Sequence, residues 1–167
     1  MPAILTNDRF RMEVSVAGYE FPDEGADIYD ANWLLIRVRL KLVYGAWTWQ
    51  VEDAGALTWE LADAVQWLRA LAAGEPVEQE WCGFSEPDIR FETIRNTEGE
   101  LVGLTIQLMD EFQPPTKVLM PRENNIVTLR FHTPPDVLLA LAERLEKQLV
   151  KFPQRGERPA ISQAQHP

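Results

Sequence analysis

The segment from residue 33 to residue 43 alternates apolar and polar side chains more regularly than any other part of the chain. Its apolar positions are Leu34, Ile36, Val38, Leu40 and Leu42, and its basic positions are Arg37, Arg39 and Lys41. A period of two places successive side chains on opposite faces of an extended strand, so one face meets a core. The pattern predicts a central strand of an antiparallel sheet, with its apolar face packed against a helix.

Weaker strand patterns lie on both sides of this segment, at residues 10–16, 47–51, 77–84, 89–95, 101–109 and 126–131. Their short connections favour antiparallel neighbours. Apolar residues at helical spacing predict one helix at about 59–73, with Thr58 as its N-cap and Gly74 closing it, and a second at about 134–152. The predicted fold class is therefore α+β, a mostly antiparallel multi-stranded sheet packed with two helices.

A chain of 167 residues has the usual size of one domain, which we expect to occupy residues 1–152. Residues 153–167 are polar and contain prolines, so we expect a disordered C-terminal tail. The chain shows neither a signal-peptide pattern near its start nor a run of roughly 20 apolar residues. We therefore expect a cytoplasmic protein without membrane attachment.

Residues that usually carry catalysis are scarce in this chain. Cys82 is the single cysteine, which excludes an internal disulfide and a multi-cysteine metal site. His132 and His166 are the only histidines, and His166 lies in the expected tail. No glycine-rich phosphate loop occurs. The sequence thus predicts a protein without enzymatic activity, metal or cofactor, and an unrecognised enzyme is the least favoured of three hypotheses.

The acidic residues are concentrated in two segments of the chain. There are 26 acidic and 16 basic residues, for a net charge of −10. Residues 19–30 hold five acids and no base, and residues 75–111 hold ten acids and two bases. A charge that served solubility alone would be dispersed, whereas a binding surface for a basic partner predicts clustering. The net charge also disfavours binding to nucleic acid or to an anionic membrane.

The two acidic segments supply the candidate partner-binding residues. These are Asp23, Glu24, Asp27, Asp30, Glu78, Glu80, Glu86 and Asp88.

Four short motifs carry a resemblance to a known family. They are YEFP at 19–22, DANWL at 30–34, LTWEL at 57–61 and FSEPDIRFE at 84–92. With these motifs the chain resembles, over about residues 10–133, the WapI-type immunity proteins of bacteria and their uncharacterised relatives. The resemblance implies a cytoplasmic protein that binds and neutralises the nuclease domain at the C-terminus of a contact-dependent toxin.

Two further hypotheses stand beside the enzyme hypothesis, and both are non-enzymatic. In the first, the protein inhibits a basic toxin through an acidic surface that imitates the charge of the toxin's nucleic-acid substrate. In the second, it is a housekeeping interaction or scaffold module of unknown partner. A gene for a large secreted repeat protein immediately upstream would favour the first hypothesis.

Overall fold

The strands form two antiparallel sheets in the computed structural model, which describes residues 1–23, 27–86, 88–115, 122–123 and 126–160. The four-stranded sheet has the order β1 (Ala3–Thr6), β2 (Phe10–Tyr19), β3 (Trp33–Leu42), β4 (Thr48–Leu57). The five-stranded sheet has the order β5 (Trp81–Gly83), β6 (Ile89–Arg95), β7 (Leu101–Leu108), β9 (Ile126–His132), β8 (Arg122–Glu123). The α-helices are α1 (Thr58–Ala73) and α2 (Pro135–Leu149), and the short 3-10 helices are η1 (Asp30–Asn32) and η2 (Asp110–Phe112).

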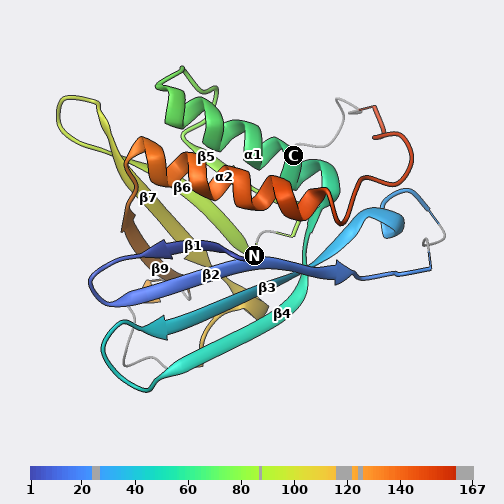
Figure 1. Ribbon diagram of the computed structural model, residues 1–167, viewed down its shortest axis with the longest axis horizontal. Helices are drawn as coiled ribbons and strands as arrows, with labels where there is room; N and C mark the ends of the chain where they lie inside the picture. Colours follow the sequence, from blue (N-terminus) through green and yellow to red (C-terminus); the bar gives the residue numbers. More distant parts are fainter. Residues whose placement is uncertain (24–26, 87, 116–121, 124–125, 161–167) are drawn as a thin grey trace.

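Both sheets and both helices share one hydrophobic core. Figure 1 shows the four-stranded sheet in front of the five-stranded sheet, with α1 and α2 side by side across one end of the two. A small apolar cavity is lined by side chains from each layer, including Ile36 of β3, Leu61 of α1, Ile89 of β6 and Leu145 of α2. Such a core is large enough to support the fold without a disulfide.

The α+β prediction is confirmed, and β3 lies inside its sheet, paired with β2 on one side and β4 on the other. The side chains of Leu34, Ile36, Val38 and Leu40 are all at most 3% exposed. The strands form two sheets rather than one because the chain leaves β4 directly into α1 and begins a new sheet afterwards. The outer strands β1 and β8 were not predicted, because segments of four and two residues carry too weak a periodic signal.

The N-terminus of α1 differs from the prediction by one residue. Leu57 occupies the N-cap position, and Thr58 is the first residue of the helix. The backbone N–H of Leu57 donates to the Glu60 carboxylate at 2.9 Å, which satisfies one of the free donors at this helix end. The Thr58 hydroxyl instead donates to the Asn32 amide oxygen at 2.7 Å. At the other end, Gly74 closes the helix with a φ of 70°, as predicted.

The first part of the predicted disordered tail is packed against the protein. Asn32 exchanges two hydrogen bonds with the backbone of Arg155, at 2.8 and 2.9 Å. The Arg158 guanidinium also forms an ion pair with Asp63 at 2.9 Å. The prediction relied on the scarcity of apolar groups, but this segment is held through backbone groups and charges. Residues 161–167 lie outside the described residues.

We predict that Gly103→Ala destabilises the protein by about 1–3 kcal/mol, the usual cost of overpacking. A Cβ at Gly103 in β7 would lie 2.3 Å from the carbonyl oxygen of Phe131 in β9, so the two strands would have to separate. The matched control is Gly18→Ala, where an added Cβ meets open space in the part of the chain that the structure describes. Urea denaturation measures both variants, and equal free energies of unfolding would contradict the prediction.

Candidate partner-binding surface

Seven carboxylates gather where several strands and short helices begin or end. They come from β4, from η1 and η2, and from the chain just after β2 and just before β6. We call them the acidic cluster, and its members are Glu20, Asp30, Asp53, Glu86, Asp88, Asp110 and Glu111.

The pairing of the strands explains why these residues meet. The backbone N–H of Glu20 donates to the carbonyl of Trp33 at 2.9 Å, which joins the end of β2 to the start of β3. The N–H of Met109 donates to the carbonyl of Asp88 at 2.8 Å, which joins the start of β6 to the residue before η2. β4 contacts η2, and this contact connects the two sheets at the acidic cluster. Antiparallel pairing thus brings five separate segments to one place.

Asp88 is the most buried member of the cluster, with 7% of its surface exposed. Burial is the largest of the effects that raise the pKa of its carboxyl, from 3.8 to about 6. The charges of Glu111, Asp110, Glu86 and Asp53 raise this pKa further. Among the described residues, the charged groups that shift the pKa of Asp88 are therefore all carboxylates, and their repulsion is the reason for treating the cluster as a candidate binding surface.

Glu20 belongs to the same electrostatic group. Its pKa is raised first by burial and then by the charges of Asp53, Asp30 and Glu86. Asp53 and Glu86 act on both Glu20 and Asp88, so the seven carboxylates form one connected region of negative potential. Such a region attracts a cationic surface and accelerates its association.

The structure brings three of the eight predicted binding residues into the acidic cluster, namely Asp30, Glu86 and Asp88. Asp23 is exposed in the same β2–β3 connection, and Glu24 lies outside the described residues. Asp27 accepts hydrogen bonds from the backbone N–H groups of Tyr29 and Asp30, at 2.8 and 3.0 Å. Its carboxylate therefore stabilises the turn that leads into η1.

Glu78 and Glu80 lie in a different place from the cluster. They follow the C-terminal end of α1, whereas Glu86 follows Ser85, whose N–H donates to Glu60 in the first turn of the same helix. Glu80 also pairs with Arg95 at 3.0 Å, and hydrogen bonds from Arg95 and Thr93 lower its pKa.

The sequence analysis did not single out four members of the cluster. Glu20, Asp110 and Glu111 lie in the two acidic segments, and their charge was counted there, so the segment charge was the available signal. Asp53 lies in a segment of balanced charge and reaches the cluster only through its position in β4. Nothing in the local sequence around Asp53 indicates this location.

The residues considered for other chemistry do not assemble in the described structure. No group of three or more His, Cys, Asp or Glu residues in the described part of the chain is arranged to hold a metal ion. Burial, with smaller contributions from Asp63 and Glu60, raises the pKa of the Cys82 thiol to about 12. A thiol with this pKa stays protonated at neutral pH and is a poor nucleophile. His132 is exposed at the end of β9.

We predict that the stability of the protein falls as the pH rises from about 4 to about 7, and that Asp88 causes part of this fall. Between the unfolded pKa of 3.8 and the folded pKa of about 6, the native state keeps a proton that the unfolded chain has lost. Asp88→Asn should therefore be more stable than the wild type above pH 6, with the gain shrinking as the pH approaches 4. Urea denaturation across this range measures the gain. Glu143→Gln on α2 is the control, and an Asp88→Asn gain that does not change with pH would contradict the assignment.

Comparison with known proteins identifies the family. The model of the immunity protein WapI-like family matches residues 3–153. No curated protein and no solved structure matches the chain. Among the described residues, neither helix is both long and apolar enough to cross a membrane. Because the family model covers most of the chain, including both sheets, both helices and the acidic cluster, the protein belongs to the WapI-like immunity protein family.

Proposed function

We propose that the protein neutralises a cognate toxin by binding a basic surface of that toxin through the acidic cluster. Membership of an immunity protein family supports a toxin-neutralising role in general. It also favours inhibition by binding over catalysis, and we place this encounter in the cytoplasm. The negative charge of the acidic cluster indicates that the toxin surface it contacts is rich in Lys and Arg.

The observation that carries this proposal is that, among the described residues, only carboxylates act electrostatically on Asp88 and Glu20. The charges that raise the pKa values of Asp88 and Glu20 are all carboxylates. Some acids elsewhere on the surface have basic partners, as in Glu52 with Arg37 and Glu146 with Arg69, both at 2.6 Å. A cationic partner would relieve the repulsion within the cluster and lower the raised pKa values of Asp88 and Glu20.

We further propose that the toxin is a nuclease. An enzyme that holds a polyanionic substrate needs a positively charged binding site, because phosphate contacts dominate the affinity for nucleic acid. Carboxylates spread over a surface can occupy such a site in place of phosphates. An inhibitor of this kind competes directly with the substrate.

We predict that the variant Asp53→Asn, Glu86→Gln, Asp110→Asn associates more slowly with the toxin domain encoded beside the gene. Removing three charges should reduce the association rate at low salt by about tenfold or more and weaken its salt dependence, because steering is electrostatic. The amide side chains keep the size of the carboxyls, and an amide oxygen at position 53 can still accept the bond that the Asp53 carboxylate receives from the N–H of Ala54. Surface-based kinetics at low and high salt, together with growth rescue in cells that express the toxin, give the readouts.

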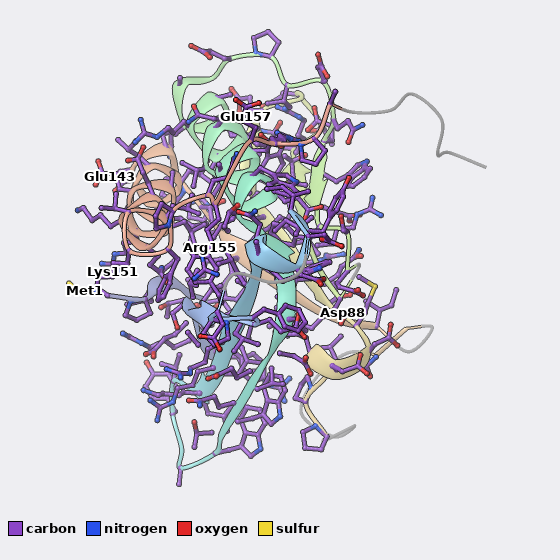
Figure 2. All side chains as sticks on the ribbon, turned by 90° about the vertical axis from the view of Figure 1, so that its right-hand side faces the viewer. Met1, Asp88, Glu143, Lys151, Arg155 and Glu157 are labelled. Atoms are coloured by element: carbon purple, nitrogen blue, oxygen red, sulfur yellow. The ribbon has the colours of Figure 1, made fainter. Side chains whose placement is uncertain are left out.

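The matched control removes the same number of charges elsewhere, as Glu75→Gln, Glu143→Gln, Glu157→Gln. These three residues are exposed, and Figure 2 shows Glu143 and Asp88 on opposite sides of the molecule. Equal association rates for the two triple variants would refute the acidic cluster as the binding surface. Wild-type protein that neither binds the toxin nor restores growth would refute the toxin-neutralising role and favour the scaffold hypothesis.

We also predict that a nucleic acid and the protein exclude each other from the toxin. A labelled oligonucleotide bound to a catalytically inactive toxin domain should be displaced by wild-type protein, with a midpoint that follows the affinity of the protein for the toxin. The cluster variant should displace it only at higher concentration. Formation of a ternary complex, detected by fluorescence anisotropy and size-exclusion chromatography, would contradict substrate mimicry.

A further inference from the structure

The segment from residue 153 to residue 158 packs across the connection between β2 and β3. The hydroxyl of Tyr19, at the end of β2, donates a hydrogen bond to the carbonyl of Pro153. The ring of Phe152 packs edge-on against the ring of Tyr19, with centroids 5.7 Å apart. In Figure 2, Arg155 lies between Lys151, which follows α2, and Asp88 of the acidic cluster. The segment therefore runs from the end of α2 past the β2–β3 connection to α1, where Arg158 pairs with Asp63.

The Arg155 side chain holds the first part of this connection, at Phe21 and Pro22. Its guanidinium donates to the carbonyls of Phe21 and Pro22, at 3.0 and 3.1 Å. The same group lies over the ring of Tyr19, with the Arg155 Cζ atom 3.6 Å from the ring centroid. A planar guanidinium can make both contacts at once, because its N–H groups point outward in the plane while its face stacks on the ring. These contacts fix the backbone immediately after Glu20.

The backbone of Arg155 holds the last part of this connection, at Asn32 just before β3. Its N–H donates to the Asn32 amide oxygen at 2.9 Å, and its carbonyl accepts from the Asn32 amide nitrogen at 2.8 Å. Asn32 ends η1, which contains Asp30 of the acidic cluster. Arg155 thus contacts both ends of the β2–β3 connection. These contacts lie beside Glu20 and Asp30, the two members of the acidic cluster in this connection.

The connection also presents two exposed aromatic side chains. Phe21 is 41% exposed and Tyr29 is 49% exposed, and they directly neighbour Glu20 and Asp30 in the sequence. Carboxylates beside aromatic rings suit a Lys- or Arg-rich surface, because cations pair with the carboxylates and stack on the rings. Aromatic anchors surrounded by polar groups are typical of the residues that dominate binding energy at interfaces.

We propose that Arg155 is a positioning residue, which presets the connection that carries Glu20, Phe21, Tyr29 and Asp30 for contact with a Lys- and Arg-rich partner surface. This inference rests on the proposed function, since it adds two aromatic side chains and the supporting residue Arg155 to the same binding surface. Ordering a loop during binding costs affinity, and a loop that is already ordered avoids this cost. Without Arg155, only the fraction of molecules with the correct loop conformation binds, and the apparent Kd rises in inverse proportion to that fraction.

Two measurements on the full-length protein test this inference. Hydrogen exchange, read on the peptides that cover residues 19–34, reports the order of the connection without any partner. Affinity for the toxin domain encoded beside the gene reports its use in binding. For Arg155→Ala we expect exchange in this region to approach the rate of an unprotected segment and the Kd to rise by about tenfold or more, because the correct loop conformation then becomes a minor fraction of the molecules. Arg155→Lys should fall between wild type and Arg155→Ala, because lysine retains the charge but not the two-pronged contact.

The matched control is Arg158→Ala, which removes the same side chain from the same segment but breaks only a surface ion pair with Asp63. It should leave both the exchange and the Kd close to wild type. Unchanged exchange in Arg155→Ala would overturn the inference, and so would faster exchange with an unchanged Kd, because Arg155 would then have a structural role only. If wild-type protein does not bind the toxin, the proposed function fails together with the binding role of Arg155, and the exchange data still report whether Arg155 orders the connection.

Discussion

The hydrogen bonds of the buried Asn32 side chain hold together the parts of the structure on which the candidate surface depends. Its nitrogen donates to the carbonyls of Ile28 and Arg155, and its oxygen accepts from the hydroxyl of Thr58 and the N–H of Arg155. An amide offers two donors and two acceptor positions, so all four are used. Aspartate could not donate these bonds and an apolar residue could make none, which would leave buried polar groups unpaired. The Asn32 side chain therefore joins the start of α1, the β2–β3 connection and the C-terminal segment.

This arrangement carries an electrostatic cost that carboxylates with a basic partner avoid. Charged side chains on the outer face of the β1–β4 sheet are paired across strands, as in Lys41 with Glu13 at 3.4 Å. In the acidic cluster, neighbouring carboxylates raise the pKa values of Glu20 and Asp88, and Asp88 is buried among them. The shared core and the polar contacts around Asn32 hold the cluster in place despite this repulsion. Natural proteins tolerate such local strain mainly at functional sites, which supports the proposal that the cluster binds a cationic partner.

The sequence predicts the elements of this fold better than their assembly. Period-two alternation located β3 and helical spacing located α1, because both patterns reflect burial on one face of a single element. Division into two sheets depends on contacts between distant segments, and no local pattern records it. The acidic cluster also depends on contacts between distant segments. Asp30 and Asp88 lie in acidic segments of the sequence, whereas Asp53 joins the cluster only because β4 pairs with β3 in this register. Arg155 was assigned to a disordered tail because composition reports apolar burial and not hydrogen bonds to backbone carbonyls.

Core and surface positions of this fold tolerate substitution to different degrees. Core positions such as Ile36 and Leu68 are constrained by packing on several sides, where a change of volume costs stability. Members of the cluster such as Glu86 and Glu111 are exposed at the ends of elements, where charge and length can change at little cost. Arg155 lies beyond residue 153, where the family match ends, yet it contacts the DANWL motif inside the matched range. A segment beyond the matched range thus supports the connection that carries Glu20 and Asp30, whereas the shared core lies inside that range.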